Sequence, residues 1–530
     1  MYKITAVALN LHDHNTYDGV WHNQRERHTR FKHNLPYRAE AYAHQSDILN
    51  PGDYRLNDEF TKEYFENMYY DLIKTDKISC DKFNVEFTKE YFKKQDDNVL
   101  AFTYTHGGIR MSKDELLQTV LKGHDEIFEY EPKKLWDNYY KNGIYYIDHH
   151  QSHATYAFMN SKFEESDILA IDGIGSKYRC VFFDKDQNLI DLSDDLPIGW
   201  LWNHMSNLTG FGTLCAGKLM GLSAYGKFSE YYYEVFDIIF NGPIKEKKYK
   251  EWKHIDFEKY GIEDLAYTLQ QFTMDKIKEF IYPLKTSDNL CVAGGVAYNG
   301  YMNEEFTKHY KNVFVPPAVG DEGQSIGAYQ HADYVLNHNK HVAETFAGKE
   351  YDVDGDEALD IKWLAQAIAD GKIIGWFQGK SESGNRALGN RCILADPRNP
   401  DIKNIINDTI KGREDFRPFA PSCMEEHYQE YFDTNQVSPF MSRIVPVKSD
   451  KIPGVTHIDN TARVQTVNKE FNLKFWTLIN EFYKITGVPM LLNTSFNRHE
   501  PIVETPAHAF KTFKKSGLDI LVINNLLFKK

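Results

Sequence analysis

The chain has 530 residues, of which 42% are hydrophobic and 14% aromatic, and its formal net charge at pH 7 is −14. Single hydrophobic cores rarely grow beyond about 250–300 residues, so this length predicts two or three globular domains. The acidic balance argues against stable nucleic-acid binding, which needs a basic surface, and no segment reaches the ~20 uninterrupted apolar residues of a membrane span.

The first residues, MYKITAVALNLHDH, predict a strand. A signal peptide would need a longer apolar run and a small-residue cleavage site. The six cysteines are scattered without a CxxC pair, which indicates neither a cysteine-based zinc site nor a disulfide framework and fits a reducing compartment. We therefore expect a cytoplasmic protein with no membrane partner. Its oligomeric state is open, and a homodimer is one option.

Four short apolar runs, most of them ending in glycine, predict buried strands followed by turns; they occupy residues 4–11, 167–175, 290–300 and 312–323. A glycine after a strand lets the backbone approach an anion, and an acid in the same turn can reach a metal. Helical stretches such as residues 265–280 separate the runs. The pattern predicts an α/β fold, although spacing alone also allows a Rossmann-type sheet.

A candidate metal site follows the strand that precedes residue 148. His149 and His153 are four residues apart, so on a helix they share a face and their imidazoles can converge on one cation. Such a pair can equally fill a polar pocket. Asp321, in the glycine-flanked GDEG turn, is an oxygen donor that would complete a set of two histidines and one carboxylate with open positions for substrate.

A domain boundary is predicted around residues 341–357, which are polar and rich in glycine and aspartate. After it, apolar residues recur at helical spacing from Ile361 to Ile368, Gly371 ends the helix, and IIGWF begins a strand. We expect one domain over residues 1–345 and a second over residues 357–530.

Residues 375–421 combine a dense group of cations with glycine, asparagine and proline. Seven Arg and Lys residues fall within 32 positions: Arg386, Arg391, Arg398, Lys403, Lys411, Arg413 and Arg417. Planar guanidinium groups beside glycine-rich backbone hold phosphate or carboxylate groups bidentately. A solvated surface patch is the alternative interpretation, but the dominance of arginine among turn residues favours an anion site.

This segment and two later runs resemble a known family. The matching runs are WFQG, GxRALGNRxIL, ADPR, IKxRExFRPFAP, TARVQTV (461–467) and TGVPMLLNTSFN (486–497). They are similar to runs of the O-carbamoyltransferases of nodulation-factor and antibiotic tailoring (the NodU/CmcH family). The similarity continues into the N-terminal half. It implies an α/β fold with a two-lobed actin-like ATPase (ASKHA) domain, which binds nucleotide between its lobes, followed by a YrdC-like α/β domain.

The resemblance also implies the metal site, with His149, His153 and Asp321 as ligands and with Asp148 and His150 orienting them. Mn²⁺, Fe²⁺ and Zn²⁺ all fit these ligand types, and the resemblance favours iron. Nucleotide and phosphate contacts are implied for the loops AIDG and GGVAYN and for the cations around them: Lys32, Asp172, Gly173, Lys218, Gly294, Gly295 and Asn299. His12 and Asp13 stand where relatives carry a His-Asp pair near the reacting groups. General-base catalysis on the acceptor hydroxyl is plausible chemistry for either, and a polar turn at the strand end is the alternative.

The family reaction uses carbamoyl phosphate and ATP, with Mg²⁺ expected on the ATP, to form a carbamoyl-adenylate in the YrdC-like domain. The actin-like domain then passes the carbamoyl group to a hydroxyl. In the C-terminal domain the expected carbamoyl phosphate and ATP contacts are Arg386, Arg391, Lys411, Arg413, Arg417, Arg463, Asn493, Ser495 and Asn497. The expected acceptor is a small molecule, a sugar or a nucleoside. Its specificity is predicted to lie in residues 50–100 and 227–290.

Two alternatives remain. Hydrogenase-maturation proteins transfer the carbamoyl group to a thiol with the same two domains, but they add an acylphosphatase domain and CxxC zinc motifs that are missing from this sequence. The other alternative is a non-catalytic nucleotide-binding regulator, and His149, His153, Asp321 and the arginines argue against it. Asn385 departs from the proline that relatives usually carry there.

Overall fold

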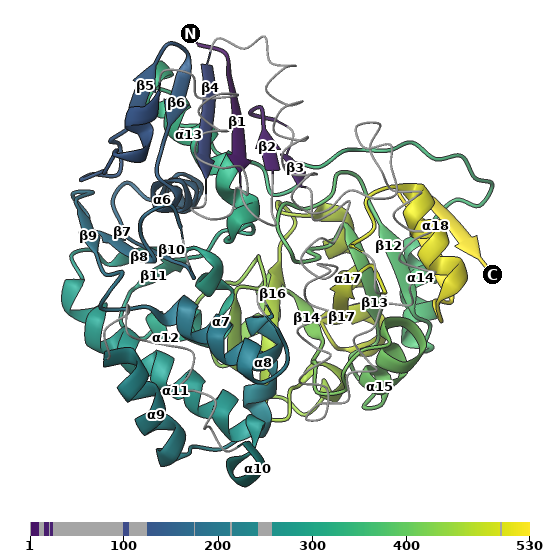
Figure 1. The fold of residues 1–530 in the computed structure, drawn as a ribbon. Helices are drawn as coiled ribbons and strands as arrows, with labels where there is room; N and C mark the ends of the chain where they lie inside the picture. Colours follow the sequence, from purple (N-terminus) through teal and green to yellow (C-terminus); the bar gives the residue numbers. More distant parts are fainter. Residues whose placement is uncertain are drawn as a thin grey trace, which may run out of the picture.

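The computed structural model describes residues 2–9, 15–20, 22–24, 99–104, 124–173, 175–212, 215–241, 257–498 and 501–530. Three β-sheets organise this part of the chain (Figure 1). We call them the first, second and third sheet in chain order. The N-terminus lies at one end of the first sheet, and the C-terminus lies beside β19, an edge strand of the third sheet.

The first sheet has the strand order β3-β2-β1-β4-β6-β5. Its strands are β1 (Ile4–Leu9), β2 (Asn15–Tyr17), β3 (His22–Gln24), β4 (Val99–Tyr104), β5 (Tyr139–Lys141) and β6 (Ile144–Tyr146). β1 pairs antiparallel with β2 and parallel with β4, and β4 pairs parallel with β6. Helices α6 (His149–Ser161) and α13 (Gln324–Asn337) pack together, and α13 also packs on β1.

The second sheet has the order β11-β10-β7-β8-β9. Its strands are β7 (Asp167–Ile171), β8 (Cys180–Phe183), β9 (Leu189–Asp191), β10 (Asn289–Ala293) and β11 (Asn312–Phe314). β7 pairs antiparallel with β8 and parallel with β10, and β10 pairs parallel with β11. On one side of this sheet lie α7 (Ile198–Leu208), α8 (Ala216–Leu222), α9 (Glu230–Asn241), α10 (Phe257–Tyr260), α11 (Ile262–Phe280) and α12 (Gly300–Phe306) (Figure 1).

The first two sheets repeat one topology. In each, the first strand along the chain is central, an antiparallel pair of strands extends to one side, and two parallel strands extend to the other. Only β5 is added, at the edge of the first sheet. This duplication confirms the predicted two-lobed actin-like α/β architecture and removes the Rossmann-type alternative, whose strands form one continuous sheet.

The third sheet is mixed and has the order β15-β16-β14-β17-β13-β12-β18-β19. Its strands are β12 (Ile374–Phe377), β13 (Arg391–Ala395), β14 (Ala420–Met424), β15 (Arg443–Pro446), β16 (Thr461–Val467), β17 (Met490–Ser495), β18 (Ile520–Ile523) and β19 (Leu526–Lys529). Its helices are α14 (Ile361–Ala369), α15 (Ile402–Ile406), α16 (Tyr428–Tyr431), α17 (Leu473–Thr486) and α18 (Pro506–Lys515). The predicted helix, glycine stop and strand near residue 371 are confirmed, because α14 ends before Gly371 (φ +91°) and β12 follows.

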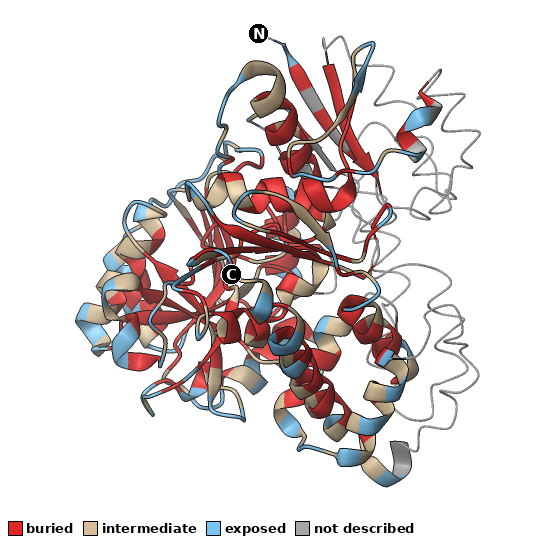
Figure 2. Cartoon of the chain, turned by 90° about the vertical axis from the view of Figure 1, so that its left-hand side faces the viewer, coloured by how far each residue is buried: buried red, intermediate tan, exposed pale blue. Residues whose placement is uncertain are grey.

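The strands of the sheets form the buried interior, and most of the exposed surface lies on helices and loops (Figure 2). One large core cluster joins the third sheet to α14 and α17, and another joins the second sheet to α7, α9 and α11. None of the described helices is both long enough and apolar enough to cross a membrane.

The third sheet is fixed to the second sheet through polar contacts at the strand edge. Gln436 Oε1 accepts from Val313 N of β11 at 2.9 Å and from Arg443 Nη2 at 3.1 Å. Asn303 Nδ2, on α12, donates to the carbonyl of Ser442 at 2.8 Å. Gly300 lies so close to β15 that an added Cβ would be 2.7 Å from Ile444 Cγ1. These contacts hold β11 and α12 against β15 and the residues beside it.

Candidate functional site

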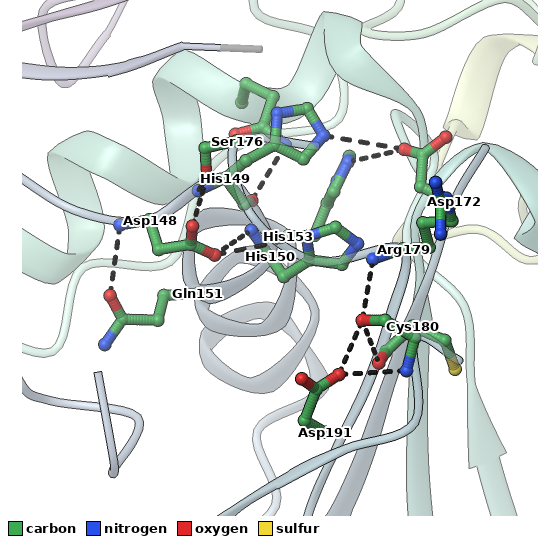
Figure 3. Close-up of polar contacts among 12 residues, drawn as sticks. Asp148, His149, His150, Gln151, His153, Asp172, Ser176, Arg179, Cys180 and Asp191 are labelled. Carbon is green, nitrogen blue, oxygen red and sulfur yellow. Dashed lines mark hydrogen bonds and ion pairs between the residues drawn. The ribbon is translucent and has the colours of Figure 1, made fainter. Parts of the chain in front are cut away.

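Four side chains converge between the first two sheets and form the histidine–aspartate cluster: His149, His153, Asp172 and Asp321. Their ligand atoms all lie within 4.8 Å of one another. His153 Nε2 is 3.1 Å from Asp172 Oδ2, and His149 Nε2 is 3.3 Å from Asp321 Oδ1. The two imidazoles are fully buried, and Figure 3 shows both directed at the carboxylate of Asp172.

The local sequence positions the two histidines because it starts helix α6 at His149. Asp148 is the N-cap of α6 and accepts from the backbone of His150 at 2.8 Å, while Gln151 Oε1 accepts from Asp148 N, which completes a capping box. Because α6 therefore begins at His149, its first and fifth residues share one face. Asp148 thus sets where the helix begins, and Ser176 Oγ also donates to its carboxylate (Figure 3).

The carboxylates come from two turns that follow strands of the second sheet. Asp172 follows β7 directly, and Asp321 begins the 3₁₀ turn Asp321–Gly323 after β11. Asp172 Oδ1 accepts from Gly173 N at 2.6 Å, and its Oδ2 accepts from Gly295 N at 3.2 Å. The AIDG and GGVAYN loops, predicted separately as phosphate loops, therefore meet at this carboxylate.

The donor set fits a divalent cation. Burial opposes the charged form of His149, but the carboxylates of Asp321 and Asp172 outweigh it and raise the pKa of His149 to about 10. Burial and the neighbouring His149 lower the pKa of His150 to about 4, so His150 stays neutral. Asp172 and Asp321 are partly buried, and two neighbouring carboxylates favour positive charge beside them. Two imidazoles with two carboxylates supply a common ligand set for Fe²⁺, Mn²⁺ or Zn²⁺.

Gly175 leaves the space that the histidines occupy. A Cβ at this position would lie 2.5 Å from His150 Cε1 and 2.9 Å from His149 Cδ2. We expect Gly175→Ala to displace His149 and to weaken divalent-metal binding by about 10–100-fold, the range found for changes that misorient a metal ligand. Gly217→Ala is the matched control, since a Cβ there has no heavy atom within 4 Å. Calorimetric titration with Mn²⁺ compares the two variants, and equal affinity would contradict the packing argument.

The structure brings together three predicted residues of the C-terminal part. Lys411, at the end of the π-helical turn Asn407–Lys411, has its Nζ 2.8 Å from Asn497 Oδ1 and 3.3 Å from Ser495 Oγ. Ser495 Oγ in turn donates to Asn497 Oδ1 at 2.8 Å. Two sequence runs more than 80 positions apart thus meet at one ammonium group.

Three further cations, Arg386, Arg417 and Arg463, form the arginine cluster. Burial lowers the pKa of Arg463, and the like charge of Arg386 lowers it further. Burial likewise lowers the pKa of Arg386, with Arg417 contributing in the same direction. Guanidinium groups that lie close together in a partly buried position suit the binding of an anion.

Lys218, on α8, reaches this cluster from the N-terminal part. Its Nζ lies 3.0 Å from Glu414 Oε1, and the other carboxylate oxygen of Glu414 is 3.4 Å from Arg417 Nη1. Burial opposes ionisation of Glu414, but Lys218 and Arg417 outweigh it and lower the pKa of Glu414 to about 2. Glu414 therefore links a predicted N-terminal phosphate contact to a predicted C-terminal one.

Other predicted residues make structural contacts. Arg391 donates to the carbonyls of Gln378 and Gly379 at 2.6 and 3.0 Å and lies 3.5 Å from the centre of the Phe377 ring. Asn493 donates to the carbonyl of Ala387 at 3.0 Å.

Arg413 donates to Asn407 Oδ1 at 3.0 Å. Asn299 caps α12 by accepting from Met302 N at 3.1 Å and donates to Gln270 Oε1 at 2.9 Å. Gly294 (φ +92°) packs against the carbonyl of Ile171. The polar side chains of Arg391, Asn493, Arg413 and Asn299 therefore hold the loops around the two clusters in place. Gly294 does so by allowing a close backbone contact.

His12, Asp13 and Lys32 lie outside the described residues. Sequence reasoning assigned Asp172 to phosphate contacts and did not foresee it beside the histidines. It also missed Glu322, although that residue directly follows Asp321, and Tyr298, although it lies within the GGVAYN loop. Glu382 was missed as well; its Oε1 accepts from Leu388 N and Asn390 N and shapes the loop that carries Arg386.

The fold defines a two-part α/β protein, with a group of possible metal ligands in its actin-like region and the arginine cluster in its mixed-sheet region. Two family models match the chain: Carbamoyltransferase N-terminus over residues 20–329 and Carbamoyltransferase C-terminus over residues 365–530. The chain therefore belongs to the carbamoyltransferase family.

Individual nodulation proteins are also similar to this chain in sequence. Nodulation protein NolNO of Sinorhizobium fredii is 36% identical over 441 residues, and the match covers 73% of this chain and 64% of that protein. Nodulation protein NolO of Bradyrhizobium diazoefficiens is 32% identical over 434 residues, covering 72% of this chain and 79% of that protein. Among solved structures, HypF of T. kodakarensis is similar at 12% identity with a TM-score of 0.30, covering 64% of this chain and 48% of that one.

Proposed function

We propose that this carbamoyltransferase is an ATP-dependent O-carbamoyltransferase that uses carbamoyl phosphate and forms a carbamoyl-adenylate. The observation that supports it is the pairing of an arginine cluster, suited to phosphates, with a buried histidine–aspartate cluster suited to a metal. We assign the metal centre to a domain over residues 1–345 and the arginine cluster to a domain over residues 357–530.

In the first half-reaction, water hydrolyses carbamoyl phosphate to carbamate and inorganic phosphate. A carbamate oxygen then attacks the α-phosphorus of ATP. Pyrophosphate leaves and carbamoyl-adenylate remains. Arg386, Arg417, Arg463 and Lys411 neutralise the phosphate oxygens, which is where negative charge develops. Ser495 and Asn497 hold Lys411 and offer hydrogen bonds to the planar carbamoyl group. Mg²⁺ accompanies the ATP.

In the second half-reaction, the acceptor hydroxyl attacks the carbamoyl carbon and AMP leaves. His149, His153, Asp172 and Asp321 would hold the divalent metal, Fe²⁺ by preference with Mn²⁺ or Zn²⁺ as alternatives, and it would supply Lewis-acid polarisation of the carbonyl. His12 or Asp13 takes the hydroxyl proton. The acceptor is a small molecule, sugar or nucleoside; the protein works in the cytoplasm without a nucleic-acid or membrane partner, as a monomer or a homodimer.

Incubation with carbamoyl phosphate, ATP, Mg²⁺ and Fe²⁺ or Mn²⁺ tests the proposal. We expect pyrophosphate release that depends on carbamoyl phosphate, and AMP formation once an acceptor is present. A kinase would release ADP, so ADP formation independent of carbamoyl phosphate would overturn the proposal. Hydroxylated sugars and nucleosides, and thiols as the alternative acceptor class, are then screened for a mass gain of one carbamoyl group.

A further inference from the structure

Tyr298 contacts two members of the arginine cluster and also Glu322, the residue next to Asp321 of the histidine–aspartate cluster. It ends the 3₁₀ turn Gly295–Tyr298, which follows β10 and precedes α12. Its hydroxyl donates to Glu322 Oε1, its ring lies under Arg386 with the guanidinium carbon 5.4 Å from the ring centre, and its carbonyl accepts from Arg463 Nη1 at 3.4 Å. One residue of the second sheet's loops therefore supports two members of the arginine cluster.

On the other side, Tyr298 is packed against the turn that carries Asp321. Glu322 is buried, and its Oε1 also accepts from Gly320 N at 3.2 Å. Gly320 leaves room for both partners, because a Cβ there would lie 2.8 Å from Glu322 Oε2 and 3.2 Å from Tyr298 Cε2. Gly320 and Glu322 flank Asp321, so the Tyr298 phenol is bonded to a residue directly beside the Asp321 carboxylate in the same turn.

The loop that presents Arg386 is itself shaped to meet this turn. Glu382 accepts from three backbone amides at its far end, those of Leu388, Asn390 and Arg391, which closes the loop. Gly384 (φ +89°) lies against the N-terminal part, since a Cβ there would be 2.3 Å from the carbonyl of Pro317. Pro317 at Gly384 and Tyr298 at Arg386 therefore both support the loop from the N-terminal part.

We infer that Tyr298 is a positioning residue that couples the histidine–aspartate cluster to the arginine cluster. Its hydroxyl holds the metal side through Glu322, and its ring and carbonyl hold Arg386 and Arg463. Gln436 and Asn303 make further contacts at the neighbouring edge of the same interface. The kinetic part of this inference rests on the proposed function, whereas the coupling itself does not.

Two substitutions separate the two halves of this role. Tyr298→Phe removes the bond to Glu322 and keeps the ring and the carbonyl, and Tyr298→Leu removes the hydroxyl and the aromatic face. Tyr282→Phe is the matched control, because its hydroxyl donates to the carbonyl of Glu305 at 3.1 Å and its ring stacks on His309, in contact with neither cluster. Thermal unfolding shows that the variants compared are folded.

The first readout is hydrogen exchange of residues 382–391 with and without Mn²⁺. We expect Mn²⁺ to slow exchange in the wild type and in Tyr282→Phe. Tyr298→Phe should bind as much Mn²⁺ as the wild type but should no longer show slower exchange. An unchanged response in Tyr298→Phe, or no response in the wild type, would overturn the coupling. This readout needs no substrate and holds whether or not the proposed reaction occurs.

The second readout is carbamoyl-phosphate-dependent ATP–pyrophosphate exchange. Tyr298→Phe should stay within about twofold of the wild type, and Tyr298→Leu should lose about tenfold in kcat/KM, because Arg386 loses its ring surface. Equal rates for Tyr298→Leu and Tyr282→Phe would overturn the positioning of Arg386. Absence of exchange in the wild type would overturn the proposed function and leave the hydrogen-exchange result standing.

Discussion

His153→Ala is expected to remove the divalent metal from the protein. The wild type, reconstituted with Fe²⁺ under anaerobic conditions or with Mn²⁺, should hold one ion per chain, and the variant should hold close to none. His153 Nε2 lies 3.1 Å from Asp172 Oδ2 at the centre of the cluster, and its loss leaves two carboxylates with a single imidazole. Loss of a residue that merely orients a metal ligand lowers activity by about 10–100-fold. Because His153 is itself a proposed ligand, the rate of acceptor carbamoylation should fall by more than that. Elemental analysis and the rate of AMP formation measure both effects.

Two companion variants make this result specific. Asp172→Asn should also lower metal content, which tests the ligand that the structure adds to the three predicted from sequence. His331→Ala is the control for lost stability, since His331 is equally buried and bonds to Tyr145 and to the carbonyl of Leu135. It should unfold more easily and keep its metal. Equal metal content in the wild type and His153→Ala would rule out the site.

Arg417→Ala is expected to slow carbamoyl-adenylate formation by roughly 10²–10³, the cost of removing one preorganised charged contact from a developing anion. Arg417 is partly exposed, and Glu414 keeps Lys218 as a partner, so the fold should survive. ATP–pyrophosphate exchange in the presence of carbamoyl phosphate is the measurement. Lys411→Ala should slow exchange similarly, but the buried carbonyl of Asn497 would lose the bond from Lys411, so a loss of stability is expected as well.

Arg398→Ala is the matched control for Arg417→Ala. Arg398 belongs to the same cation-rich segment but pairs with Asp396, Nη2 to Oδ2 at 2.6 Å, near the surface. Its loss should lower stability, because the buried carboxylate of Asp396 loses its guanidinium partner, and should leave exchange unchanged. Pyrophosphate release by Arg417→Ala at the wild-type rate would remove the arginine cluster from the adenylate-forming step.

Local sequence was sufficient to predict several elements of this protein. His149 and His153 lie on one helical face because their spacing matches the helix period and Asp148 caps the helix just before them. The glycine-ended runs became β7 and β10 with their turns, and Gly371 separates α14 from β12. These features depend on neighbours within a few residues, whose dihedral preferences and hydrogen bonds act without the rest of the fold.

The tertiary structure decided which of these features meet. Parallel pairing of β7 with β10 puts Asp172 beside Gly295 at one sheet edge and so brings its carboxylate to the histidines. Pairing of the third sheet's strands brings Ser495 and Asn497 to Lys411.

The same packing assigned the cations their roles. Arg391 is buried against carbonyls and an aromatic ring, whereas Arg386 and Arg463 contact Tyr298 of the N-terminal part. A sequence shows that an arginine is present, but its partner is set by strand register and by the packing of the N- and C-terminal parts. Contacts between residues distant in the chain therefore determine which cations we expect to bind an anion.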